Sequence, residues 1–224
     1  MVKFERKDTT KSKLAITSLK NAKDKNSTYN TQEVNDALHE MFYGKCYICE
    51  NKAATSNQIE HLIPHKGNID LKYDWNNLFW SCAHCNNTKL GMFEPILDCT
   101  AEDVDKIIAF RKEGYFGTQE KFIFAALDER LETLNTVKLL ESVYYGTTPQ
   151  KKIEAKIIRK SVRDEIAKFK GMLRDYNEAE GDDKKDLELY VKKELQNKSA
   201  FTAFKRWLIR DHRDFYPEFM QYIS

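Results

Sequence analysis

Two Cys-x-x-Cys pairs, Cys46–Cys49 in CYICE and Cys82–Cys85 in CAHCNNTK, stand with 32 residues between them. Four thiolates from two such pairs can surround one Zn²⁺ as a tetrahedron, with Zn–S distances of about 2.3 Å. Because thiolates would fill all four positions, the zinc would be structural rather than catalytic. The alternative is chance spacing of free thiols. Cys99 is unpaired and is expected to be a small buried residue. His84, inside the second pair, is expected on the surface.

The segment between the pairs carries groups suited to phosphodiester hydrolysis. A neutral imidazole titrates near working pH, so His61 suits the base that deprotonates a water. Asn77 is expected to accept a hydrogen bond from His61 Nδ1, which would leave Nε2 for that water. Glu60 and Asn86 offer oxygen ligands for Mg²⁺ or Mn²⁺, and such a cation neutralises charge on the phosphate and the leaving oxygen.

Each of these residues also has a purely structural interpretation. A lone His61 is usually a satisfied structural histidine, Asn77 a turn residue, and Asn86 a helix cap. Their combination inside one zinc frame favours a site instead. Lys89, three residues after Asn86, is a candidate phosphate contact on the helix of that site. His65 is expected to be structural.

The ordered string C-x2-C…(D/E)-H-x-x-P…N-L…C-x2-C-(H/N)-x-x-K over residues 46–89 resembles the HNH endonucleases. Their site is two strands and a helix around one divalent ion, the ββα-metal arrangement. The resemblance implies that His61, Asn77, Glu60 and Asn86 are catalytic, with Glu60 and Asn86 on the ion. The last position is Asn86 rather than His, and an amide oxygen favours Mg²⁺ or Mn²⁺ over softer metals.

A wider pattern, CYICE…IEHLIP…DWNNL…SCAHCNNTK, resembles a narrower group, the HNH subunits of Septu-type anti-phage defence systems, including those attached to retrons. Members of that group pair with an ABC-type ATPase. The resemblance therefore implies an effector subunit with an ATPase partner.

The composition sets the class of protein. The chain has 224 residues, enough for one or two domains, and is 41% hydrophobic and 32% charged, which is typical of a helix-rich globular protein. Its longest apolar run, FIFAAL at 122–127, is far shorter than a membrane span, and MVKFERKDTTKSK does not resemble a signal peptide. We therefore expect a cytoplasmic protein without membrane contact, where reduced thiols favour zinc over disulfides.

Positive charge is unevenly distributed. The formal net charge is only +2, yet residues 1–26 carry eight Lys/Arg against three acids, residues 151–174 nine against three, and residues 191–213 seven against two. Such stretches suit a phosphate backbone without specifying base sequence. The alternative is that they are solvated helix faces.

The predicted fold is mainly α with a small zinc-stapled ββα module, α+β overall. Residues 1–29 are expected to be a loosely structured basic arm, 30–99 the HNH module, and 100–224 a helical domain for partner docking and nucleic-acid contacts. A helix is predicted after the cap Asn30, a strand over 57–62, and a helix from Asp103 through Phe110.

Three apolar stripes and two breaks are predicted in the helical domain. The breaks fall at 146–150 and 177–183. The stripes are Phe124, Leu127, Leu131 and Leu134; then Ile158, Val162, Ile166, Phe169, Leu173 and Tyr176; then Phe201, Phe204 and Leu208.

The predicted function is that of a metal-dependent HNH endonuclease, with DNA as the default substrate and RNA as the other possibility. The alternative is a zinc-ribbon regulatory subunit that binds nucleic acid or protein without catalysis. The aromatic end FTAFKRWLIRDHRDFYPEF, 201–219, is a candidate docking seam for the ATPase. The competing interpretation is that Phe201, Phe204 and Leu208 face the protein's own core.

Overall fold

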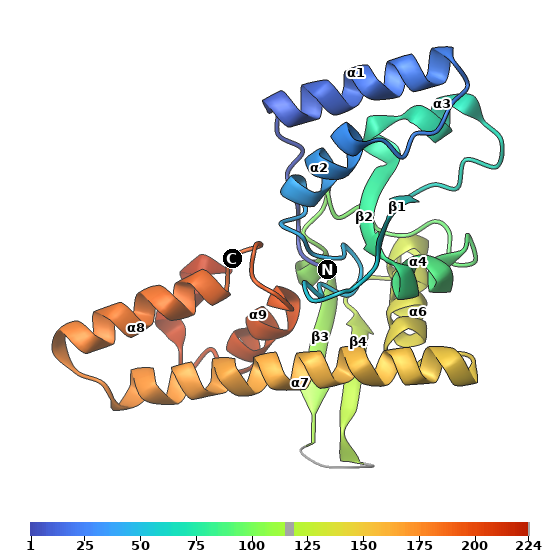
Figure 1. Cartoon of the computed structure of the whole chain (residues 1–224). Coiled ribbons are helices and arrows are strands. Elements are labelled where there is room, and N and C mark those ends of the chain that lie inside the picture. The colour runs from blue at the N-terminus through green and yellow to red at the C-terminus, as the bar shows by residue number, and fades with distance from the viewer. Residues whose placement is uncertain (115–118, 224) are drawn as a thin grey trace.

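The computed structural model describes residues 1–114 and 119–223, which form a mainly helical α+β structure with two small sheets (Figure 1). Among these residues no helix is both long and apolar enough to cross a membrane. The elements, in chain order, are α1 (Thr10–Asp24), α2 (Gln32–Met41), β1 (Asn57–His61), α3 (Ile69–Tyr73), η1 (Trp75–Asn77), β2 (Leu78–Cys82), α4 (Ala83–Lys89), α5 (Val104–Ile107), β3 (Ile108–Glu113), β4 (Lys121–Ala126), α6 (Leu131–Tyr145), α7 (Pro149–Glu178), α8 (Gly181–Glu194), α9 (Thr202–Asp211) and η3 (Pro217–Tyr222).

The centre of the N-terminal half is a ββα unit. β1 pairs antiparallel with β2, so that Glu60 lies opposite Phe79 and His61 opposite Leu78. The helix α4 follows β2 without a loop, because Cys82 is both the last residue of the strand and the N-cap of the helix. The strand predicted at 57–62 is confirmed and ends one residue earlier, at His61.

The N-terminal region is more ordered than predicted. Residues 10–24 form a complete helix, α1, whose cap Thr9 exchanges hydrogen bonds with Ser12 in a capping box. The next helix, α2, is capped by Thr31 rather than by Asn30. In Figure 1 α1 and α2 lie together with α3 on the side of the β1–β2 hairpin away from α7. The prediction of a loosely structured arm is therefore wrong for most of its length.

A second hairpin replaces a predicted helix. Only Val104–Ile107 are helical after the expected cap, and Ile108–Glu113 form β3, which pairs antiparallel with β4. Phe110 lies opposite Phe124, and both side chains are buried. Branched and aromatic residues pack well on a pleated surface, so two neighbouring apolar runs prefer to pair as strands. Phe124 therefore belongs to a sheet, while Leu131 and Leu134 are 58% and 41% exposed, so the first predicted stripe is wrong.

The helix α7 crosses the whole molecule (Figure 1). It spans 30 residues, from Pro149 at its first position to Glu178, and its predicted apolar stripe is buried from end to end. The predicted breaks are confirmed on both sides, since α6 ends at Tyr145 and α8 begins at Gly181. One end of α7 lies beside α4 and α6, and its later part packs against α8 and α9.

Phe201 and Phe204 at the start of the aromatic C-terminal segment belong to the core. Phe201 and Phe204 are 1% and 3% exposed. The Phe204 ring lies 5.6 Å from Phe110, 5.9 Å from Phe124 and 5.7 Å from Tyr144, measured between ring centroids. The interpretation that these residues face the protein's own core is therefore correct, and a docking seam on their side chains is ruled out by their burial.

The position of Phe204 predicts its energetic role. Phe204→Ala removes the ring at the junction of β3, β4 and α6, and such truncations in a core cost about 3–5 kcal/mol of unfolding free energy. Chemical denaturation should show that loss. Phe215→Ala is the matched control, because the Phe215 side chain is 76% exposed. Equal stability of the two variants would contradict the packing described here.

Candidate active site

The four paired cysteines converge on one point. Cys46, Cys49, Cys82 and Cys85 are buried, and their sulfur atoms all lie within 4.8 Å of one another. The Sγ atoms of Cys49 and Cys82 are 3.9 Å apart. A zinc tetrahedron with Zn–S bonds of about 2.3 Å has edges of about 3.8 Å, so this spacing fits the ion.

Electrostatics also favours a metal at this cluster. Burial, followed by contact with the other sulfurs, raises the pKa of Cys85 well above its ordinary value, because an isolated thiolate loses its hydration there. Several thiolates can coexist at such a place when a divalent cation balances them. The cluster therefore fits a structural zinc, held by all four predicted residues.

Backbone hydrogen bonds attach the first cysteine pair to the hairpin. Tyr47 N donates to Trp80 O at 2.9 Å, which joins the loop between Cys46 and Cys49 to β2. Glu50 adopts the left-handed conformation with φ of 61°, so the chain turns sharply after Cys49. These contacts place the loop beside the strand that ends at Cys82, and the sulfur cluster follows from that pairing.

His61 is held by one ring nitrogen. Its Nε2 lies 3.1 Å from Lys72 O, and since a carbonyl can only accept, Nε2 carries the hydrogen. Burial lowers the pKa of His61 below its ordinary value, so the ring is neutral near pH 7 and Nδ1 has the lone pair. The sequence-based expectation assigned the two nitrogens the opposite way. The His61 ring also meets Tyr29 and His65 edge-on, with centroids 4.8 Å away in both cases.

Asn77 organises the loop around His61 instead of bonding the ring. Its Oδ1 accepts from Ile63 N at 2.8 Å, and its Nδ2 donates to Ile63 O at 2.8 Å and Leu71 O at 3.0 Å. The expected hydrogen bond from His61 Nδ1 is therefore replaced by three bonds to the backbone. Ile63 follows His61 closely and Leu71 precedes Lys72, so Asn77 fixes both ends of the segment that holds the ring.

Lys89 lies inside the protein rather than on a phosphate-binding surface. Its side chain is fully buried in the last turn of α4, and Nζ donates to Glu60 Oε1 at 2.9 Å, His61 O at 2.9 Å and Glu94 Oε1 at 3.2 Å. The prediction of a phosphate contact is wrong because all three ammonium hydrogens are directed inward. Burial raises the pKa of Glu60, and the Lys89 ammonium opposes that shift.

Asn86 faces β1 one helical turn before Lys89. Its Nδ2 donates to Gln58 Oε1 at 2.6 Å, and Gln58 lies two residues before Glu60 on the same face of the strand. The amide hydrogens of Asn86 therefore point at Gln58, and its Oδ1 is the atom that remains suited to an ion. Glu60 and Asn86 both project into the contact between α4 and β1.

His84 is a structural link that the sequence analysis placed on the surface. Its side chain is only 9% exposed, with Nδ1 2.6 Å from Glu154 Oε2 of α7 and Nε2 2.9 Å from Val143 O of α6. Both partners accept hydrogen bonds, so the ring joins α4 to two helices of the C-terminal half. The spacing inside a Cys-x-x-Cys pair offers no signal for such a long-range contact.

The hairpin, helix and cysteine cluster correspond to a known class of domain. Residues 46–90 match the family model described as HNH endonuclease, so the ββα unit is an HNH endonuclease domain. No solved structure matches the chain.

Two curated relatives, both named Septu protein PtuB, resemble part of the chain. The protein from Bacillus mycoides (strain KBAB4) is 34% identical over 83 residues, covering 30% of this chain and 28% of the relative. The protein from Bacillus thuringiensis is 31% identical over 83 residues, covering 34% and 32%. The match thus spans less than a third of either relative.

The cysteine cluster predicts a folding metal. Elemental analysis of purified protein should find about one zinc per chain, because structural zinc sites contribute directly to folding free energy. Cys82→Ser should lower the thermal transition sharply or give insoluble protein, whereas Cys99→Ser, a buried cysteine outside the cluster, should keep its zinc. A fully folded chain without zinc would contradict this assignment.

The burial of Lys89 predicts a loss of stability when its charge is removed. Lys89→Gln leaves the buried Glu60 carboxylate and the partly exposed Glu94 carboxylate without their ammonium, and breaking a buried pair costs about 3–5 kcal/mol. Denaturant unfolding should show this loss, with Lys66→Gln, an exposed lysine between β1 and α3, as the control. A phosphate contact would instead change substrate affinity and leave stability alone.

Proposed function

We propose that this protein is a metal-dependent HNH endonuclease that hydrolyses phosphodiester bonds of nucleic acid, with DNA as the default substrate. We further propose that it is the effector subunit of an anti-phage defence complex containing an ABC-type ATPase. The observation that carries the catalytic assignment is the placement of His61 in the ββα unit, with its ring oriented by Lys72 O. Lys72 O accepts the hydrogen bond from His61 Nε2. The lowered pKa favours the neutral ring, in which Nδ1 carries the lone pair that can accept a proton.

The residues have separate roles in this proposal. His61 accepts a proton from the attacking water through Nδ1, and the Lys72 carbonyl keeps the ring oriented during that transfer. Asn77 positions the loop on both sides of the ring and does not itself exchange a proton. Glu60 and Asn86 would hold a Mg²⁺ or Mn²⁺ ion, which supplies positive charge to the scissile phosphate when bound.

The first turns of α7 offer contacts for a phosphate backbone. Lys151 Nζ donates to Asn87 O of α4 at 2.9 Å, so this end of α7 lies against the helix that carries Asn86. Lys152, Lys156 and Lys160 follow at intervals of four residues and are exposed. Charges on one helix face beside the site suit a substrate held by its backbone, without base readout.

Two arguments support the proposed ATPase partner. One is the likeness to the Septu proteins, and the other is that a nuclease without base readout needs another component to control it. Phe201, Phe204 and Phe219 are excluded from the ATPase docking surface by their burial, whereas Phe215 in the same segment is 76% exposed. Exposed apolar residues elsewhere beyond residue 100 remain, among them Leu127, Leu131 and Leu134 at 53%, 58% and 41% exposure. Exposed apolar residues of this kind suit contact with a protein partner.

One observation favours the alternative of a zinc-stapled module without catalysis. The Lys89 ammonium already bonds Glu60 Oε1, so the carboxylate has a cation before any metal binds. If Lys89 fully satisfies Glu60, the pocket would be inert and the chain would act as a binding subunit. Metal-dependent cleavage distinguishes the two functions.

Substitution of the base tests the proposed chemistry. His61→Ala should lower cleavage of plasmid, single-stranded DNA or tRNA in Mg²⁺ or Mn²⁺ by about 10²- to 10⁴-fold, the usual contribution of a general base. The assay is run with and without the ATPase. His212→Ala, an exposed histidine at the end of α9, should cleave normally.

Zinc content and thermal transition should stay near wild type in His61→Ala, because the ring's role is chemical. Cleavage by His61→Ala at the wild-type rate would remove the nuclease assignment from this site. Wild-type protein that never cleaves any of the three substrates, even with the ATPase present, would favour the inert module.

A further inference from the structure

The segment before α1 crosses the loop that carries Asn77. Phe4 N donates to Cys99 O at 2.8 Å, and the Phe4 side chain is fully buried against Phe42. Thr9 then caps α1. Residues between these two anchors are thus held in place at both ends, although they lie outside the HNH segment at 46–90.

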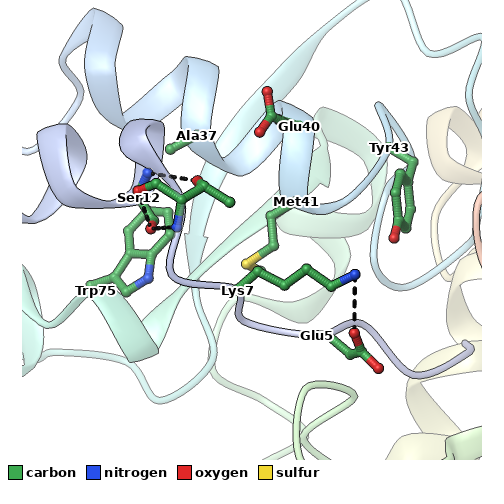
Figure 2. Close-up of a pocket in the computed structure, with 9 residues that line it drawn as sticks. Glu5, Lys7, Ser12, Ala37, Glu40, Met41, Tyr43 and Trp75 are labelled. Atoms are coloured by element: carbon green, nitrogen blue, oxygen red, sulfur yellow. Dashed lines mark hydrogen bonds and ion pairs between the residues drawn. The ribbon is translucent and has the colours of Figure 1, made fainter.

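Charged side chains in this segment have different surroundings. Glu5 and Lys7 pair with each other at 3.2 Å and line a pocket together with Met41 and Trp75 (Figure 2). Their side chains are 66% and 63% exposed. Arg6, between them, is half-buried, and desolvation lowers the pKa of its guanidinium. A cation in such a place needs specific partners.

The partners of Arg6 are three backbone carbonyls around Asn77. Nη1 donates to Trp75 O at 2.9 Å, while Nη2 donates to Asn76 O at 2.9 Å and Leu78 O at 3.0 Å. The guanidinium carbon also lies 4.9 Å from the centre of the Phe79 ring. One planar group therefore brackets Asn77 from both sides of the chain and rests on the first residues of β2.

These contacts form a continuous path to the histidine. Arg6 holds the η1 turn, and Asn77 in that turn bonds Ile63 on one side of the His61 loop and Leu71 on the other. Leu71 is followed by Lys72, whose carbonyl accepts the Nε2 hydrogen of His61. Each step is a hydrogen bond or a single peptide unit, so the orientation of the imidazole depends on the position of the turn.

We infer that Arg6 is a positioning residue for this site: it clamps the turn 75–78 so that Asn77 and His61 keep their working geometry. The inference deepens the proposed nuclease function and rests on it only for its kinetic test. A lysine could not replace Arg6 fully, because an ammonium is a point donor and lacks the planar fork that spans three carbonyls.

Two roles for a basic residue in this segment make opposite kinetic predictions. A phosphate contact would change KM and the dependence of binding on salt. A positioning residue changes kcat, because small displacements of a catalytic group cost roughly 10- to 100-fold in rate. Lys7 is the matched control, since it is adjacent, carries the same charge and is exposed.

The experiment compares full-length wild type, Arg6→Ala, Arg6→Lys and Lys7→Ala. Cleavage kinetics in Mn²⁺ should show kcat reduced roughly 10- to 100-fold in Arg6→Ala with little change in KM, and an intermediate loss in Arg6→Lys. Added guanidinium ion, at concentrations well below those that denature, should restore part of the Arg6→Ala rate. Lys7→Ala should keep its kcat.

Amide hydrogen exchange provides a readout independent of catalysis. Peptides covering 62–64 and 75–79 should exchange faster in Arg6→Ala and Arg6→Lys, while the cysteine cluster keeps its zinc. If Arg6→Ala does not fold, cleavage kinetics and hydrogen exchange are both measured on Arg6→Lys. Unchanged exchange in these peptides, or a salt-dependent rise in KM with kcat intact, would overturn the inference. If wild type proves not to be a nuclease, the exchange result alone decides.

Discussion

The convergence of four buried sulfurs is the constraint on which the site depends. Cys82 ends a strand and begins a helix, and Cys85 lies inside that helix, so the cluster fixes the angle at which α4 leaves β2. That angle determines which residues of α4 meet β1, namely Asn86 opposite Gln58 and Lys89 opposite Glu60. A structural metal bound by these four cysteines would in this way fix the positions of the residues proposed to act on the substrate.

Buried cations form the next level of organisation. Lys45, Lys89 and Lys205 are each at most 1% exposed, and each bonds residues from distant parts of the chain. Lys45 reaches Glu50 and the carbonyl of Asn197, and Lys205 joins Glu165 of α7 to Glu194 of α8. Such pairs contribute little net stability relative to apolar packing, but removing one partner is costly. These ion pairs therefore specify where the segments lie relative to one another more than they add to the free energy of unfolding.

The parts of the structure that were predictable are those with local, regular signals. Three patterns have a residue spacing that fits a single local structure: the Cys-x-x-Cys pairs, the strand β1 and the buried stripe of α7. The hairpin β3–β4 was missed because Ile107, Ile108 and Phe110 fit a helix face as well as a strand. Residues 108–113 form a strand because they pair with residues 121–126, and this partner cannot be recognised from the local sequence.

The role of each residue in the site was harder to predict than which residues form the site. The residue types of His61 and Asn77 are compatible with a direct hydrogen bond, but the structure uses Asn77 to hold backbone groups. Lys89 was expected at a phosphate, and His84 at the surface because four thiols already complete the zinc site, yet acceptors from other elements surround both. Net charge by segment has the same weakness, since it counts Lys205 and Arg206 as surface cations although both are buried. It also counts Arg6, whose guanidinium bonds backbone carbonyls of residues 75–78.

The length of α7 has a mechanical consequence. Near its first turns it is tied to α4 through Lys151 with Asn87 and Glu154 with His84, and along its later part it packs on α8 and α9. A helix of 30 residues is about 45 Å long. If such a rod pivots through about 5°, its tip travels about 4 Å, more than the length of a hydrogen bond. The contacts at one end of α7 could not absorb such a displacement, so the packing at its two ends must be satisfied together.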